Sequence, residues 1–184
     1  AAIVAAITEL VRQSERDLGC PVRVGVATPG AISPATGLLK NSNTTCLNGA
    51  PLAHLLAAAL DRDVRLSNDA NCFALSEAVD GAGAGHRTVF GVIIGTGTGA
   101  GIVVDGRVLD GPNAIAGEWG HNPLPWREPH EVEPDCYCGK RGCLETYLSG
   151  PGLAAEHRRR LEVESSAVAI AAAAPHDPGA DETL

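Results

Sequence analysis

The sequence contains no methionine and few aromatic residues, which limits how its core can be built. Of its 184 residues, 3% are Phe, Trp or Tyr, while 45% are hydrophobic and 20% are charged. This composition is typical of globular chains and excludes a disordered one. We therefore expect a core of Ala, Val, Leu and Ile, in one ordinary domain or two small lobes.

Positive charge and long hydrophobic runs are also scarce. The chain has 14 Lys and Arg against 22 Asp and Glu, a formal net charge of −8, with a pI near 5.1. Such acidity disfavours nucleic-acid and anionic-membrane partners, so an anionic substrate such as ATP would need backbone dipoles or a metal ion. The apolar stretches are short and interrupted, which predicts no membrane span. Residues 1–10 also lack the basic start and long apolar core of a secretion signal.

The six cysteines are distributed unevenly. Three lie singly, and three fall within eight positions: Cys20, Cys46 and Cys72, then Cys136, Cys138 and Cys143. A secreted disulfide framework usually spreads its cysteines along the chain. The uneven pattern favours a reducing, cytoplasmic compartment and one metal site.

Periodicity and turn residues predict an α/β chain. We expect helices at 1–17, 52–60, 70–79, 152–163 and 166–174, and strands at 22–27, 64–66, 88–94, 102–104 and 107–109. The strand at 88–94 is continuously apolar, which is typical of a strand buried on both faces. Strands alternating with helices around the Gly-rich segment 81–86 predict two lobes around a cleft, 1–86 and 87–184.

The cysteine cluster predicts a zinc site. Cys136, Cys138 and Cys143 lie on a loop short enough to converge on one ion, and thiolates suit tetrahedral zinc. A closed structural site needs a fourth ligand. His121 can supply it, since it ends the polar stretch from Gly117 just upstream. A disulfide or three free buried thiols are the alternatives.

A glycine-rich run follows the apolar strand and predicts a phosphate loop. Its residues are Gly95, Thr96, Gly97, Thr98 and Gly99, followed by Ala100 and Gly101. Glycines let backbone N–H groups turn toward a polyphosphate. The run is neither a P-loop nor a dinucleotide fingerprint, because no Gly-Lys-Ser/Thr and no helix follow. A glycine-rich hairpin without a ligand is the alternative.

The sequence Asn68-Asp69-Ala70-Asn71 stands at a predicted strand end and helix start. Asp69 there can cap the helix. It can also act as a base that takes a proton from an attacking hydroxyl, as in phosphoryl transfer to alcohols. Glu118 and Glu145, near the metal loop, can neutralise charge or bind sugar hydroxyls.

These four motifs in this order resemble the ROK family of repressors, open reading frames and sugar kinases. They are Asn-Asp-Ala-Asn, Gly-Thr-Gly-Thr-Gly, Gly-Glu-Trp-Gly-His and Cys-x-Cys-Gly-x-x-Gly-Cys-x-Glu. The resemblance covers residues 22–152, and segments 37–49 and 68–125 look most like the fructokinase/mannokinase branch. It implies a partial two-lobed fold related to actin and hexokinase, of ribonuclease H-like type, with a zinc-binding loop.

The resemblance also implies roles for individual residues. Asp69 would deprotonate the 6-hydroxyl of a hexose, fructose or mannose, for attack on the γ-phosphate of ATP carried with Mg²⁺. Matching sugar-facing positions are Gly30, Asn43, Asn68, Glu118, His121 and Glu145, and Thr96 and Gly97 fall on the nucleotide-phosphate loop. Zinc would be structural, holding His121 and the Cys loop so that Glu118 and Glu145 point into the pocket. Relatives often form homodimers.

The sequence departs from the family pattern at both ends. Family kinases begin with a strand carrying Asp-x-Gly-Gly-Thr and end with segments that complete the adenosine site, and neither is found here. We therefore expect the chain alone to be inactive or very weak as a kinase. The alternatives are a sugar-sensing repressor, a glucokinase or N-acetylhexosamine kinase of the same family, and a zinc-bearing scaffold without catalysis.

Overall fold

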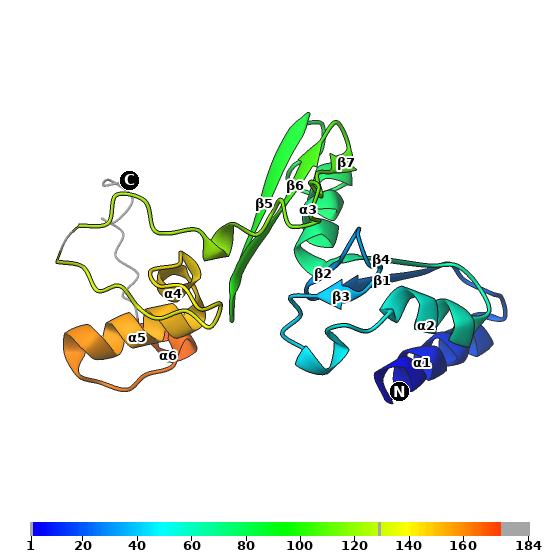
Figure 1. The fold of residues 1–184 in the computed structure, drawn as a ribbon, viewed down its shortest axis with the longest axis horizontal. Helices are drawn as coiled ribbons and strands as arrows, with labels where there is room; N and C mark the ends of the chain where they lie inside the picture. Colours follow the sequence, from blue (N-terminus) through cyan, green and yellow to red (C-terminus); the bar gives the residue numbers. More distant parts are fainter. Residues whose placement is uncertain (1, 129, 174–184) are drawn as a thin grey trace. The chain divides into compact units, whose positions relative to one another are not determined.

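The computed structural model describes residues 2–128 and 130–173 (Figure 1). These residues form two compact units. Unit 1 contains the residues up to Gly91 together with Gly101–Gly117, and unit 2 contains Val92–Ala100 together with the residues from Glu118 on. Strands β5 (Thr88–Ile94) and β6 (Thr98–Val104) contribute residues to both units. Because lobes are a property of the whole protein, the division into lobes 1–86 and 87–184 stays a prediction.

Unit 1 has the expected α/β pattern. Besides parts of β5 and β6, its elements are α1 (Ala2–Leu18), β1 (Val24–Thr28), β2 (Ala31–Ile32), β3 (Leu39–Lys40), the 3-10 helix η1 (Thr45–Leu47), α2 (Leu52–Leu60), β4 (Val64–Asn68), α3 (Asp69–Val79) and β7 (Arg107–Val108). β1 and β4 pair in parallel, and β2 and β3 form an antiparallel hairpin. The predicted helices and strands of this unit are confirmed, but their bounds differ: β1 begins two residues later than expected, β4 is two residues longer, and β6 begins four residues earlier, at Thr98.

The core of unit 1 is small and aliphatic, as the lack of Met and aromatics predicts. Leu39, Leu52 and Leu56 are at most 2% exposed and cluster with apolar side chains from α1, β1 and β4. α1 ends where Gly19 takes a φ of +69° and its N–H donates to the Glu15 carbonyl. Helices α1 and α2 thus pack against the parallel pair of β1 and β4.

Strand β5 is not buried on both faces, so that prediction is wrong. The sheet order is β5-β6-β7, which places β5 at an edge among the described strands. One face packs on α3, where Gly91 approaches Ala74 so closely that an added Cβ would lie 2.9 Å from the Ala74 Cβ. The opposite face exposes Phe90, Val92 and Ile94 by 51%, 38% and 59%. An apolar run alone does not tell an edge strand from a central one.

Unit 2 contains short helices joined by long irregular segments. Besides its parts of β5 and β6, its elements are the 3-10 helix η2 (Trp119–His121), α4 (Glu145–Leu148), α5 (Gly150–Leu161) and α6 (Ala167–Ala173). The irregular stretch predicted for 110–151 is confirmed apart from η2 and α4. Among the described residues, every helix is too short or too polar to cross a membrane.

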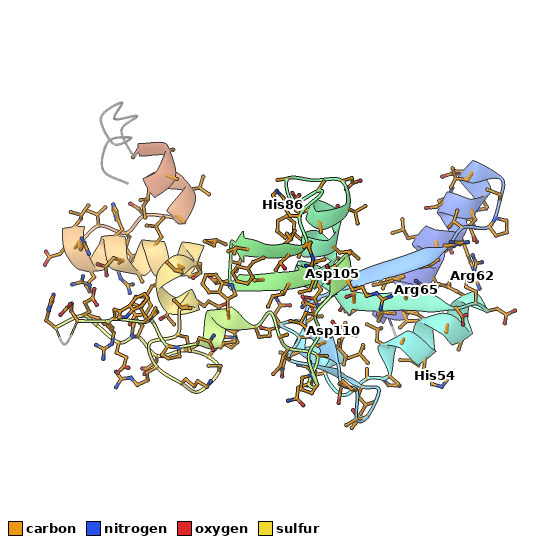
Figure 2. The ribbon with its side chains drawn as sticks, turned by 90° about the horizontal axis from the view of Figure 1, so that it is seen from above. His54, Arg62, Arg65, His86, Asp105 and Asp110 are labelled. Atoms are coloured by element: carbon orange, nitrogen blue, oxygen red, sulfur yellow. The ribbon has the colours of Figure 1, made fainter. Side chains whose placement is uncertain are left out.

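A single ion pair ties α1 to the segment after α2. The Arg62 guanidinium, labelled in Figure 2, donates to both carboxylate oxygens of Glu15 and to the Val22 carbonyl. The Val22 N–H donates to the same carboxylate over 3.0 Å. The hydrogen bond from Arg62 is the main reason that the pKa of Glu15 lies below its ordinary value. Its charged form therefore stabilises the folded state.

Replacing Glu15 with Gln should lower stability in a pH-dependent way. Because the folded-state pKa of Glu15 is depressed, its contribution is present above the unfolded pKa of about 4.3 and is lost as pH falls through the lower folded value. The urea midpoint of Glu15→Gln should lie below that of the parent chain at pH 7, and the gap should close toward pH 3. Glu9→Gln removes an exposed pair with Arg16 and should change little at either pH. An equal difference in urea midpoint at pH 7 and pH 3 would show that the charge of Glu15 does not stabilise the fold.

Candidate functional site

In unit 1 the parallel register brings two predicted site residues to one sheet edge. Thr28 pairs with Asn68 at the carboxyl ends of β1 and β4, the edge at which open α/β sheets bind ligands. The Asn68 Nδ2 donates to the Gly30 carbonyl over 3.1 Å. Gly30 and Asn68 are therefore in direct contact.

Asp69 does not cap α3, which corrects one of its two interpretations. The cap is Asn68, whose Oδ1 accepts from the Asn71 N–H over 3.1 Å. Asp69 is the first residue of the helix, and its Oδ1 accepts from the Ala70 N–H over 2.9 Å. Its side chain is exposed. Capping by its neighbour leaves the Asp69 carboxylate accessible to a substrate.

Gly30 and Asn43, both predicted to face the sugar, differ in burial and in how closely they are packed. Gly30 is buried with a φ of +78°, and a Cβ there would lie 2.3 Å from the Lys40 carbonyl oxygen. Only glycine fits, so packing explains this residue without a ligand. Asn43 is exposed and follows Ser42, whose backbone nitrogen also lies beside Gly30. The sugar-facing role of both residues stays a prediction.

In unit 2 the four predicted zinc ligands come together. The ligand atoms of His121, Cys136, Cys138 and Cys143 all lie within 4.8 Å of one another. The Sγ atoms of Cys138 and Cys143 are 3.7 Å apart, and the Cys136 Sγ lies 3.6 Å from the His121 Nδ1. Tetrahedral zinc with Zn–S bonds of about 2.3 Å places its sulfurs about 3.8 Å apart. The donor set and its spacing therefore fit one zinc ion.

Backbone hydrogen bonds build this cluster from two segments. The Gly139 N–H donates to the Cys136 carbonyl and the Cys136 N–H to the Lys140 carbonyl, which folds the loop back on itself. The Leu144 N–H donates to the Asn122 carbonyl, so the last cysteine is held beside the segment that carries His121. The ligands are thus positioned by the fold of both segments.

The pKa values of two thiols in the cluster are shifted in opposite directions. Burial is the main cause that raises the pKa of Cys143 to about 12, while a backbone hydrogen bond with Lys140 is the main cause that lowers the pKa of Cys138. Cys143 is 1% exposed, whereas Cys138 is exposed. A buried thiol ionises readily only beside a compensating cation. The chemistry of the donor set therefore also fits a bound metal ion.

The glycine run forms a tight connection between β5 and β6, and its backbone is turned toward Glu145. The Thr98 N–H donates to the Glu145 Oε2 over 2.8 Å, and an added Cβ on Gly97 would lie 2.6 Å from the same oxygen. The Gly95 N–H donates to the Gly97 carbonyl. The Thr98 hydroxyl is buried and has no hydrogen-bond partner among the described residues. The loop thus donates one backbone N–H to a carboxylate, and its role as a phosphate loop stays a prediction.

Glu145 and His121 are linked by Tyr137, which sequence reasoning missed. The Tyr137 hydroxyl lies 3.1 Å from the His121 Nε2, and the two rings meet edge to face. Although Tyr137 is 83% exposed, its hydroxyl end lies among polar groups. Burial of that end is the main cause that raises the pKa of Tyr137 to about 12, and the charges of Glu145, Cys136 and Glu118 add to it. The predicted residues Glu118, His121 and Glu145 therefore surround one phenol.

Glycine at position 120 is required for this arrangement. A Cβ on Gly120 would lie 2.0 Å from the Thr98 carbonyl oxygen, and this contact is with backbone, which cannot move aside cheaply. η2 therefore lies directly against the start of β6. His121 follows Gly120, so the same contact places the imidazole.

Gly120→Ala should destabilise the chain by about 1–3 kcal/mol, the usual cost of overpacking, because the new Cβ collides with backbone. Urea unfolding measures this, and bound zinc should fall in parallel because His121 shifts. Gly25→Ala is the control, since a Cβ on Gly25 meets nothing within 4 Å. Equal stability of the two variants would show that η2 does not lie against β6.

Cys138→Ser should release zinc. Three remaining ligands cannot close a tetrahedral structural site, so the variant should lose its metal at chelator concentrations that leave the parent chain loaded. Metal analysis after dialysis measures this. Cys46→Ser, which removes an exposed cysteine outside the cluster, should retain the metal. Retention of zinc by Cys138→Ser would remove that residue from the ligand set.

Curated relatives identify the branch that this chain is similar to. N-acetyl-D-glucosamine kinases from several Escherichia coli strains are 44% identical to it over 158 residues, which is 83% of this chain and 52% of theirs. The chain therefore spans about half the length of the curated relatives it matches. The expected likeness to the fructokinase/mannokinase branch is not supported, because these relatives belong to its alternative, the N-acetylhexosamine kinases.

Solved structures confirm the fold. A ROK hexokinase from Thermus thermophilus superposes with a TM-score of 0.78 at 30% identity, covering 98% of this chain and 59% of its own. A ROK family glucokinase from Streptomyces griseus, solved with glucose and AMPPNP, gives a TM-score of 0.67 at 29% identity, covering 88% and 50%. The predicted partial, hexokinase-like α/β fold is thus confirmed. Since the ROK family model also matches residues 1–184, the chain belongs to the ROK family.

Proposed function

We propose that this protein is an ATP-dependent kinase that phosphorylates N-acetyl-D-glucosamine at its 6-hydroxyl. The observation that carries the proposal is the 44% identity to N-acetyl-D-glucosamine kinases over 158 residues. That region includes an exposed carboxylate at a sheet edge and a zinc-type cluster. Because the chain spans about half of those relatives, their activity is a proposal for this protein.

Asp69 is the proposed base. Its exposed carboxylate accepts the proton of the sugar 6-hydroxyl, whose oxygen then forms a bond to the γ-phosphorus of ATP. The bond between that phosphorus and the bridging oxygen of ADP breaks, and ADP leaves with the electron pair. Asn68 supports this role, since it supplies the helix cap in place of Asp69.

The polar groups of unit 2 are proposed to bind sugar hydroxyls. A neutral polyol needs donors and acceptors together, and Glu118, His121 and Glu145 offer two carboxylates and an imidazole near one another. Gly30, Asn43 and Asn68 are the proposed sugar-facing residues of unit 1.

The glycine run is proposed to bind the phosphates of ATP through its backbone. Gly95, Thr96, Gly97, Thr98 and Gly99 supply small side chains and hydroxyls, and Mg²⁺ would offset phosphate charge on this acidic protein. When bound, zinc would have a structural role through the thiolates and His121. A cytoplasmic location, where thiols stay reduced, and a homodimer are the remaining parts of the proposal.

A sugar-sensing repressor is the second candidate, because the ROK family includes repressors as well as kinases. The intact Asp69 favours the kinase, since a sensor needs no base. Specific binding of duplex DNA by the complete protein would favour the repressor.

In the complete protein, Asp69→Asn should lower phosphoryl transfer by roughly 10²–10⁴-fold, the usual share of a general base, because an amide cannot accept the proton. Binding of N-acetyl-D-glucosamine should survive. Coupled ADP release measures turnover, and calorimetry measures binding. Asp63→Asn, an exposed aspartate before β4, is the control and should keep full turnover. Retained activity in Asp69→Asn would remove this residue from its role.

The preferred sugar tests which branch of the ROK kinases this protein resembles in activity. The kcat/KM for N-acetyl-D-glucosamine should exceed the values for fructose, mannose and glucose in the same ADP-release assay. A highest value for fructose or mannose would reinstate the branch first expected from the sequence. The 184-residue chain by itself should show little or no turnover, and robust turnover would refute that expectation.

A further inference from the structure

Tyr137 lies where the described polar groups of unit 2 converge. Its hydroxyl is 3.1 Å from the His121 Nε2, and its pKa is raised mainly by burial and then by the charge of Glu145. The other ring nitrogen of His121, Nδ1, lies 3.6 Å from the Cys136 Sγ, on the side of the thiol cluster. The imidazole therefore uses one nitrogen toward the cluster and the other toward the phenol.

The two nitrogens have fixed roles when Nδ1 ligates the metal. A histidine that ligates through Nδ1 carries its proton on Nε2, so Nε2–H donates to the Tyr137 hydroxyl oxygen. The Tyr137 O–H can then donate to the Glu145 carboxylate. One hydroxyl can thus accept from an imidazole and donate to a carboxylate, the same pairing that the proposed function assigns to a sugar hydroxyl.

Little besides these hydrogen bonds holds the Tyr137 side chain. The residue is 83% exposed, and its printed ring contact is the edge-to-face meeting with His121, at a centroid distance of 5.2 Å. An exposed ring of this kind can rotate away at the cost of its hydrogen bonds. The backbone nearby includes Gly139 with a φ of +86°, a turn that presents the ring on the surface.

We propose that the Tyr137 hydroxyl competes with the substrate sugar for the distal nitrogen of His121. When no sugar is bound, the phenol is the partner of Nε2 and positions the ring for the metal. A sugar hydroxyl takes its place on binding. The second statement rests on the proposed function, whereas the first concerns this chain and its metal alone.

Tyr137→Phe separates the hydroxyl from the ring. The variant keeps the edge-to-face contact and loses only the competing group, so N-acetyl-D-glucosamine should bind roughly fivefold more tightly, the value of one net hydrogen bond. KM should fall with kcat unchanged. Tyr147→Phe is the matched control, since its hydroxyl donates to the Val132 carbonyl in the same unit. It should change neither value.

Zinc affinity tests the positioning role without any sugar. Loss of an outer hydrogen bond to a ligating histidine usually weakens metal binding by about tenfold or more. Chelator competition should therefore show weaker zinc binding in Tyr137→Phe than in the parent chain or Tyr147→Phe. Saturating N-acetyl-D-glucosamine should abolish the difference, because the sugar then partners Nε2.

The outcomes separate this inference from the proposed function. Unchanged or weaker sugar binding in Tyr137→Phe would overturn the competition. Equal zinc affinity in the three proteins would overturn the positioning role. If the complete parent protein binds no hexose, the proposed function and the competition both fall, and the zinc measurement still decides whether Tyr137 holds His121.

Discussion

The backbone of Thr98 is the point on which the arrangement of unit 2 depends. Its N–H donates to Glu145, and its carbonyl oxygen lies so close to Gly120 that no side chain fits there. One residue at the start of β6 therefore fixes both the helix that begins with Glu145 and the 3-10 turn that ends in His121. The carboxylate and the imidazole come together because both segments are packed on the same peptide.

His121 connects this arrangement to the metal site. Its Nδ1 lies on the side of the cysteines and its Nε2 on the side of Tyr137 and Glu145. Contacts thus run from the Thr98 backbone to Glu145, and from Tyr137 through His121 to the thiols. A structural ion in this position orients a polar group as well as closing a loop, which is a general role of partners around a metal ligand.

The sequence predicted those features that depend on local spacing. The three cysteines and His121 converge as expected because their loop is short and their donor types match one ion. The assignment of helices and strands in unit 1 was correct because their apolar periodicity and their Gly and Pro boundaries agree.

Other features depend on tertiary contacts that spacing does not encode. Asn68 and Asp69 can each cap a helix, and only the backbone geometry decides between them. The exposed face of β5 follows from its edge position. Tyr137 could not be predicted as a site residue from the sequence, because an exposed aromatic residue between two cysteines forms no recognisable pattern. Its position near Glu145 depends on how the loop folds. The branch within the family was misjudged because kinases for different hexoses share these motifs.

The buried residues of unit 2 explain why metal and fold are coupled there. Among its described residues, the buried apolar side chains are those of Ala100, Cys136, Cys143 and Leu144. Two of the four are predicted metal ligands, so the cluster forms much of the interior of the irregular segment. A segment with so small an apolar core gains little from hydrophobic burial. A metal ion bound by the predicted ligands would add to its ordering, because the free energy of binding would then be in effect free energy of folding.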